Sequence, residues 1–145
     1  MEIYTIGFTK KTAAQFFETL KLAGIRRLID VRLNNTSQLA AFAKRDDLEY
    51  FLREICAAEY RHEPVLAPTQ DILDAYKHKQ ITWEQYENRF RALLAGRAAE
   101  RSVDRQLFGV PAVLLCSEPK ADRCHRRVAA EYLASHWGDV RIVHL

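Results

Sequence analysis

The sequence predicts an α/β protein, a three-layer αβα sandwich around a mainly parallel sheet of about five strands. Two observations favour this fold class. Short apolar runs typical of buried strands alternate along the chain with amphipathic segments of helical length. Strands separated by helices form βαβ units, and the sheet that such units build is parallel and covered on both faces.

The first half of the chain alternates strands with helices. Thr9 precedes the first helix and is expected to cap it, and Gly24 closes that helix. Asp46 or Asp47 begins the next one, because acidic side chains favour the first turn of a helix. The expected elements are a strand over 2–6, a helix over 11–22, a strand over 27–31, a helix from 46 or 47 to 55, and a strand over 59–62.

The second half continues this alternation after a turn region between Pro64 and Pro68. Thr82 and Gln85 have the spacing of a capping box. Trp83 and Tyr86 follow at helical spacing and are expected as core or lid aromatics. The expected elements are helices over 69–77 and 82–97, a strand over 111–116, a helix over 126–137 and a closing strand over 139–144. With no repeat and no low-complexity linker, one domain over residues 1–145 is expected.

Composition excludes several classes of protein. The hydrophobic fraction of 48% and charged fraction of 28% are those of a soluble globular protein, and no apolar run reaches the roughly 18 residues of a membrane span. Three cysteines and no signal-peptide pattern favour reduced thiols in the cytoplasm. A net charge of +3 permits a small anionic ligand but does not favour long nucleic acid. No glycine-rich nucleotide motif is present, so no cofactor is expected.

Polar residues follow four of the expected strands. They are Gly7 with Thr9, Asp30 with Arg32, His62 with Glu63, and Cys116 with Glu118. In open α/β sheets, ligands bind outside the carboxyl ends of the strands. These residues are therefore expected to line one crevice.

The segment from residue 112 to 128 concentrates reactive side chains. An apolar strand ends on Cys116, a polar loop follows, and Cys124, His125, Arg126 and Arg127 stand at the start of a helix. Helix N-termini favour anions and thiolates, because their backbone N–H groups are unpaired and the dipole is positive there. Cys116 also fits simple core packing, since free cysteine is often buried.

Several short motifs recur together in one known family. They are Thr-Ile-Gly over 5–7, Asp-Val-Arg over 30–32, Trp83 with Tyr86, and Leu-Leu-Cys-Ser-Glu over 114–118 followed by Cys-His-Arg over 124–126. With these motifs the chain resembles the bacterial family called domain of unknown function 488. That family commonly has histidine after its first glycine, where this chain has Phe8. The resemblance implies a fold and a pocket, and no particular reaction.

Three functions are compatible with these residues. The first is a thiol-dependent enzyme with a phosphate- or sulfate-like anion pocket, in which Cys116 or Cys124 is the nucleophile. The second is a non-catalytic module that binds the phosphate of a nucleotide or nucleic acid. The third is a metal site made by Cys116, Cys124, His125 and Asp30, although their spacing matches no common zinc motif.

The first function gives each candidate residue a role. Arg32, Arg126 and Arg127 are expected to bind the anion, beside Gly7, Thr9 and the helix-start amides near Cys124. Glu118 or Asp30 would orient the arginines or act as acid and base, and His125 would orient a neighbour or hydrogen-bond the anion. Asp30 is expected to be buried and therefore paired, with Arg32 as one partner.

Overall fold

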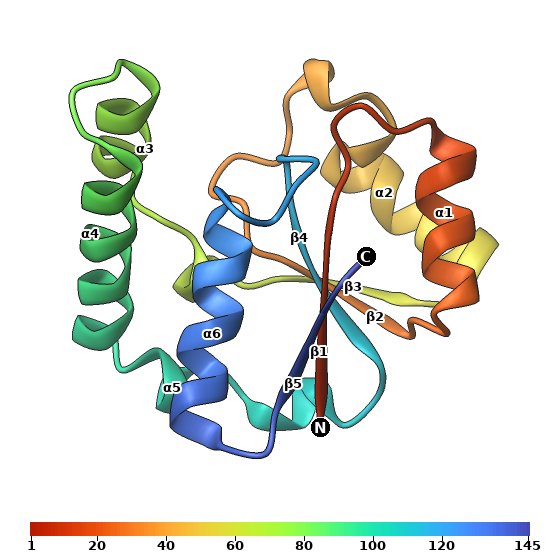
Figure 1. Ribbon diagram of the computed structural model, residues 1–145. Helices are drawn as coiled ribbons and strands as arrows, with labels where there is room; N and C mark the ends of the chain where they lie inside the picture. Colours follow the sequence, from red (N-terminus) through yellow and green to blue (C-terminus); the bar gives the residue numbers. More distant parts are fainter.

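The computed structural model describes all 145 residues and contains the parallel sheet that the sequence predicts. Every strand pairing is parallel, and the strand order is β3-β2-β4-β1-β5 (Figure 1). The central strand β4 is buried along its whole length, as its apolar sequence requires. The strands are β1 Glu2–Gly7, β2 Arg27–Asp30, β3 Glu59–His62, β4 Ala112–Cys116 and β5 Arg141–His144.

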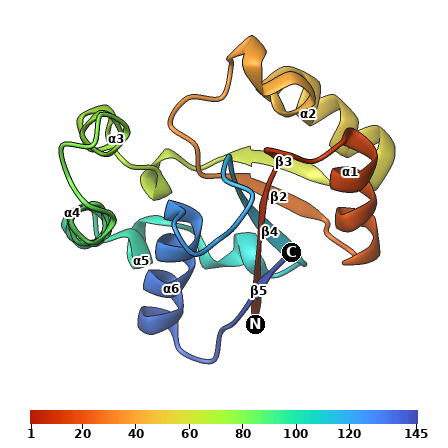
Figure 2. The ribbon, with the colours of Figure 1, turned by 45° about the horizontal axis from the view of Figure 1, so that its top comes forward.

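Helices cover both faces of the sheet, which confirms the predicted fold class. Figure 2 shows α1 and α2 on one side of the sheet and α6 on the other. The helix α4 packs against α6, and α3 packs against α4. The helices are α1 Ala13–Leu22, α2 Arg45–Phe51, α3 Gln70–Lys77, α4 Trp83–Gly96, α5 Ala99–Ser102 and α6 His125–Trp137.

Alternation along β4 decides which face each side chain enters. Val113 and Leu115 join the apolar cluster under α1 and α2, whereas Leu114 and Cys116 join the cluster under α4 and α6. Successive side chains of a strand point to opposite faces. Cys116 therefore ends the strand on the α6 side, next to the start of that helix.

Some predicted boundaries were wrong. The cap of α1 is Thr12, whose hydroxyl accepts from the Gln15 N–H while the Gln15 side chain accepts from the Thr12 N–H. A capping box satisfies two backbone donors and is preferred to a cap on Thr9. The Thr9 N–H donates instead to the Ser117 carbonyl at 3.1 Å. The helix expected to reach residue 55 is α2 followed by a wider π turn over Leu52–Cys56, which ends at Ala57 with φ of 51°.

The carboxyl ends of the central strands meet at one edge of the sheet. Gly7 of β1 lies opposite Cys116 of β4, and Asp30 of β2 lies opposite Leu115. The backbone pairing continues one residue beyond β2, because the Val31 N–H donates to the Leu115 carbonyl at 3.1 Å. Of the residues that the sequence predicts for a crevice at this edge, Arg32, Cys116 and Glu118 line a cavity there. His62 and Glu63 do not, and His62 Nε2 instead lies 2.8 Å from the Arg32 carbonyl oxygen. None of the helices is long and apolar enough to span a membrane.

Candidate functional site: a Cys-His pair at the strand ends

A cavity of about 260 Å³ opens at this edge of the sheet. Three parts of the chain line it: the loop after β2, the junction between β4 and α6, and the facing sides of α3 and α4. The lining residues are Arg32, Leu33, Asn34, Leu73, Tyr76, Trp83, Tyr86, Cys116, Ser117, Glu118, Arg123, Cys124 and His125. The position agrees with the rule that open α/β sheets bind ligands beyond the strand carboxyl ends.

Cys116 and His125 form a hydrogen-bonded pair that contributes to the cavity wall. The Cys116 Sγ lies 3.3 Å from His125 Nδ1, and His125 Nε2 lies 2.7 Å from the Val31 carbonyl oxygen. Because a carbonyl only accepts, Nε2 carries a hydrogen, and Nδ1 of the neutral ring is a free base facing the thiol. The ring edge packs against Phe90, with centroids 5.6 Å apart. His125 is therefore fixed in the tautomer that can take the Cys116 proton.

The surroundings of Cys116 favour its thiolate. Burial alone would raise the pKa of Cys116, but hydrogen bonds from Cys124 and from the Glu118 and Ser117 backbone, with the Arg126 charge, outweigh burial and lower it. Cys124 is affected in the opposite direction. Burial, the hydrogen bond to Cys116 and the Cys116 charge raise the pKa of Cys124 well above the ordinary range. Of the two thiols, Cys116 therefore has the lower pKa and loses its proton more easily.

A soft cation is the other chemical entity that this cluster suits. One ligand atom each from Cys116, Cys124 and His125 lies within 4.8 Å of the others. Thiolate with imidazole is a donor set typical of zinc, and three protein donors leave a fourth position open. Asp30, the fourth residue of the expected metal set, is fully buried in a different interaction.

Asp30 and Arg32 form a closed, buried ion pair. The Arg32 guanidinium donates from Nε and Nη2 to the two Asp30 oxygens, both at 2.9 Å, and from Nη2 to the Ala43 carbonyl at 2.8 Å. Tyr60 also donates to Asp30, at 2.6 Å. Arg32 lines the cavity, yet these bonds direct its donors toward the protein. The pair ties the loop after β2 to the sheet.

Gly7, Arg126 and Thr9 shape the β4–α6 loop from below. Arg126 is 1% exposed, and its guanidinium donates to the Thr5 hydroxyl and the Glu118 carbonyl. Gly7 lies so close to this loop that an added Cβ would stand 1.6 Å from the Glu118 carbonyl oxygen. None of the three residues lines the cavity. They hold the loop that presents Ser117 and Glu118 to it.

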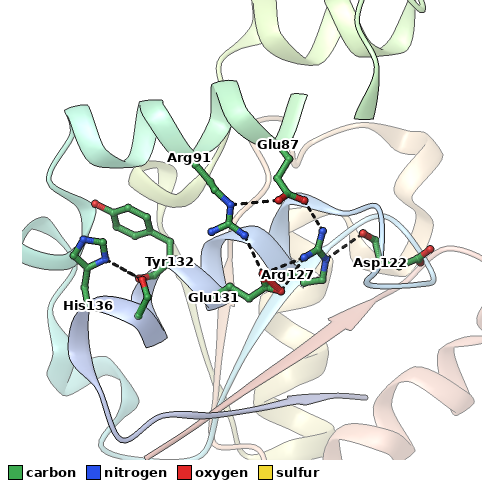
Figure 3. A network of polar contacts seen from close by, with 8 residues as sticks. Glu87, Arg91, Asp122, Arg127, Glu131, Tyr132 and His136 are labelled. Carbon is green, nitrogen blue, oxygen red and sulfur yellow. Dashed lines mark hydrogen bonds and ion pairs between the residues drawn. The ribbon is translucent and has the colours of Figure 1, made fainter. Parts of the chain in front are cut away.

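Arg127, which was expected to bind the anion, lies in an ion-pair network outside the cavity (Figure 3). Its guanidinium contacts Glu87 of α4 at 2.7 Å and Glu131 of α6 at 2.8 Å, and donates to the Asp122 carbonyl. Arg91 of α4 bonds the same two carboxylates. The network fastens α4 to α6 and so fixes the wall of the cavity that α4 supplies.

Replacing Arg127 by alanine is therefore expected to lower the free energy of unfolding without weakening ligand binding. The side chains involved are partly exposed, so the expected loss is about 1 kcal/mol. Urea denaturation measures the loss, and phosphate protection of the cysteines against alkylation measures binding. Loss of phosphate protection in a folded R127A variant would contradict this placement.

The wall opposite Cys116 contains residues that the sequence analysis missed. Tyr76 packs against Trp83 and Tyr86, with ring centroids 5.7 Å and 5.0 Å apart, and Trp83 stacks on Tyr86. Leu73 and Tyr76 are three residues apart on α3, which is the spacing of one helix face. This spacing does not by itself indicate a cavity. The packing of Tyr76 against Trp83 and Tyr86 shows that this face of α3 lines one.

The sheet and its Cys-His pair define an α/β protein with a buried cysteine hydrogen-bonded to a histidine at the strand carboxyl ends. The family model described as Domain of unknown function DUF488 matches residues 12–133. The chain belongs to this family, as its motifs indicated. Comparison with curated proteins and with solved structures gave no match.

Proposed function

We propose that this protein is a thiol-dependent enzyme that acts on a small anionic substrate, with Cys116 as nucleophile and His125 as its base. The observation that carries the proposal is the 3.3 Å contact between Cys116 Sγ and His125 Nδ1, with His125 Nε2 held by the Val31 carbonyl. A nucleophile, a base in hydrogen-bond contact and a third group that orients the base are the parts of nucleophilic catalysis.

The path of the Cys116 proton follows directly from this arrangement. His125 Nδ1 takes the Cys116 proton, and the resulting imidazolium has an acceptor for each N–H, the thiolate at Nδ1 and the Val31 carbonyl at Nε2. The thiolate attacks the electrophilic atom of the substrate, and the imidazolium returns the proton to the leaving group. Hydrogen bonding from the Ser117 and Glu118 backbone lowers the pKa of Cys116 and so favours the attacking thiolate.

Charge around the cavity supports an anionic substrate. Arg123 lines the cavity, is exposed and has no ion-pair partner. Arg126 adds a buried positive charge beneath the loop, and α6 begins at His125, so its positive end faces the same space. Arg123 thus replaces Arg127 as the proposed contact for the anion, while Arg32 and Asp30 act as positioning residues. Reduced thiols are required, so a cytoplasmic location is part of the proposal.

Site-resolved alkylation tests the nucleophile. In the folded protein, iodoacetamide is expected to modify Cys116 with an inflection below the ordinary thiol pKa of about 8.5. Cys56, whose pKa burial raises, reacts only at higher pH. Phosphate, used as the anionic probe, is expected to slow the reaction at Cys116 and not at Cys56. If the protein is instead a non-catalytic module, it is expected to bind phosphate, while Cys116 is alkylated slowly and with an ordinary thiol pKa.

His125→Gln is the matched variant. Glutamine keeps an N–H donor for the Val31 carbonyl but offers no base to Cys116. Its Cys116 inflection is expected to move upward, whereas Cys56→Ala leaves it in place. An unchanged Cys116 profile in folded H125Q would sink the assignment of His125 as base. If the purified protein contains one zinc ion per chain and the C116A variant contains none, Cys116 is a metal ligand and the proposed nucleophile is contradicted.

A further inference from the structure

A second thiol stands beside the nucleophile. Cys124 contributes to the same cavity as Cys116, and the two sulfur atoms lie within 4.8 Å of each other. Both cysteines are buried, at 2% and 4% exposure, in the same apolar cluster. The third cysteine, Cys56, lies in the turn after α2 and outside this cluster. Only one pair of thiols is therefore in contact.

The position of Cys124 leaves its side chain free to react. Cys124 is the N-cap of α6, with extended backbone at φ −137°, and its side chain makes no capping bond. Rotation of this side chain breaks no hydrogen bond of the helix, because only the backbone carbonyl of Cys124 is bonded there, to the Arg127 N–H at 3.1 Å. The loop of residues 117–123 joins the two cysteines, so a bond between the sulfurs closes only a short ring.

We propose that Cys124 is the resolving thiol of Cys116, and that the protein reduces small anionic disulfides by dithiol–disulfide exchange. This inference rests on the proposed function, since it requires Cys116 to be the nucleophile. It adds the reaction class, a two-electron reduction, and a further catalytic residue.

The exchange balances with the groups in the cavity. The Cys116 thiolate attacks one sulfur of a disulfide R–S–S–R, forming the mixed disulfide Cys116–S–S–R and releasing RS⁻, which takes the proton held on His125. The neutral imidazole then accepts the Cys124 proton, and the Cys124 thiolate attacks the Cys116 sulfur. The Cys116–Cys124 disulfide forms, the second RS⁻ leaves and takes that proton, and the substrate is reduced to two thiols.

Geometry gives this order, because Cys116 is the thiol that is hydrogen-bonded to His125 Nδ1, and the electrostatics of the pair agree with it. Cys124 keeps its proton while Cys116 is charged, because burial, the hydrogen bond to Cys116 and the Cys116 charge all raise the Cys124 pKa. When Cys116 enters the mixed disulfide, its charge and its acceptor role disappear. Two of the causes that raise the Cys124 pKa are then removed, and Cys124 becomes easier to ionise. Reaction of the first thiol thus favours ionisation of the second.

Oxidised glutathione is the probe that tests the inference, because it is a small disulfide with a net negative charge. The reduced, desalted protein is mixed with it, and released thiols, intact mass and cysteine peptides are measured. Wild-type chains and Cys56→Ala are expected to release two glutathione thiols each, lose two hydrogen masses and yield a Cys116–Cys124 peptide. Cys124→Ala is expected to release one thiol and keep one glutathionyl group on Cys116. Cys116→Ala releases none.

The outcomes separate this inference from the proposed function. If Cys116 is alkylated rapidly but the wild-type protein yields no Cys116–Cys124 peptide, the inference is overturned and Cys116 remains the nucleophile. If Cys116 reacts with neither iodoacetamide nor oxidised glutathione, the inference and the proposed function are both overturned. Because Cys124 is a core residue, circular dichroism verifies that C124A is folded. The wild-type peptide result decides the matter independently of that variant.

The charge of the substrate is tested with a matched pair of disulfides. Oxidised glutathione is expected to react at least about tenfold faster than cationic cystamine at low ionic strength, because the positive surroundings concentrate anions at the cavity. Arg123→Ala reduces this preference, while Arg127→Ala leaves it unchanged because Arg127 lies outside the lining. Equal or reversed rates overturn the anionic class.

Discussion

Gly7→Ala is expected to destabilise the protein by about 3 kcal/mol or more, the upper range for an overpacked core position. The added Cβ would lie 1.6 Å from the Glu118 carbonyl oxygen and 2.6 Å from its carbonyl carbon. Both are backbone atoms, so no side-chain rotation relieves the clash. The Arg126 Nη1, at 2.9 Å from the same Cβ, closes the other side. Either β1 or the β4–α6 loop must move.

Gly96→Ala is the matched control for this experiment. An added Cβ at Gly96, the last residue of α4, meets no atom within 4 Å. Alanine is preferred to glycine in a helix, so this variant is expected to gain up to about 1 kcal/mol. Urea denaturation of both variants measures the difference. Equal stabilities would show that the β4–α6 loop is not held against β1 as the structure describes.

The second large effect is expected at the buried ion pair. Arg32→Met should lower the free energy of unfolding by about 3–5 kcal/mol, because it leaves the fully buried Asp30 carboxylate without its cation. Tyr60 and Asn35 still donate to that carboxylate, but neither carries a charge. Methionine keeps the length of the side chain, so the loss reports the missing charge and hydrogen bonds more than a cavity.

A double variant and an exposed pair complete this test. In Asp30→Asn combined with Arg32→Met both charges are gone, and the double variant is expected to lose less than the sum of the two single losses. Arg45→Met removes an ion pair whose side chains are 52% and 87% exposed, and should cost less than about 1 kcal/mol. Additive losses at Asp30 and Arg32 would mean that the two residues are energetically independent.

The fold could be predicted because its signals are local. Strands such as residues 112–116 are continuous apolar runs, and helices such as α4 begin at a capping box, so type and order follow from short stretches of sequence. A boundary was predicted wrongly where two caps compete. Both Thr9 and Thr12 precede α1, and only the reciprocal bond with Gln15 selects Thr12.

The candidate site was only partly predictable because its contacts are long-range. Cys116, Cys124 and His125 stand in one short segment, so their proximity could be expected. The pairing of the buried Asp30 with Arg32 was also expected and is confirmed. The partners of Arg126 and Arg127 could not be expected, because the fold buries Arg126 under Glu118 and places Arg127 between two glutamates. Those partners are known only once strands and helices are assembled.

The carbonyl that orients His125 belongs to the main chain. The Val31 carbonyl accepts from His125 Nε2, and the Val31 N–H donates to the Leu115 carbonyl. The pairing with β4, the strand that ends in Cys116, therefore also orients the base. An alanine scan of the cavity will therefore miss one of the groups on which the chemistry depends, since every side chain at position 31 leaves that oxygen in place. Substitutions at the buried Val31 change core packing, whereas this part of the orientation of the imidazole is inherited from strand pairing.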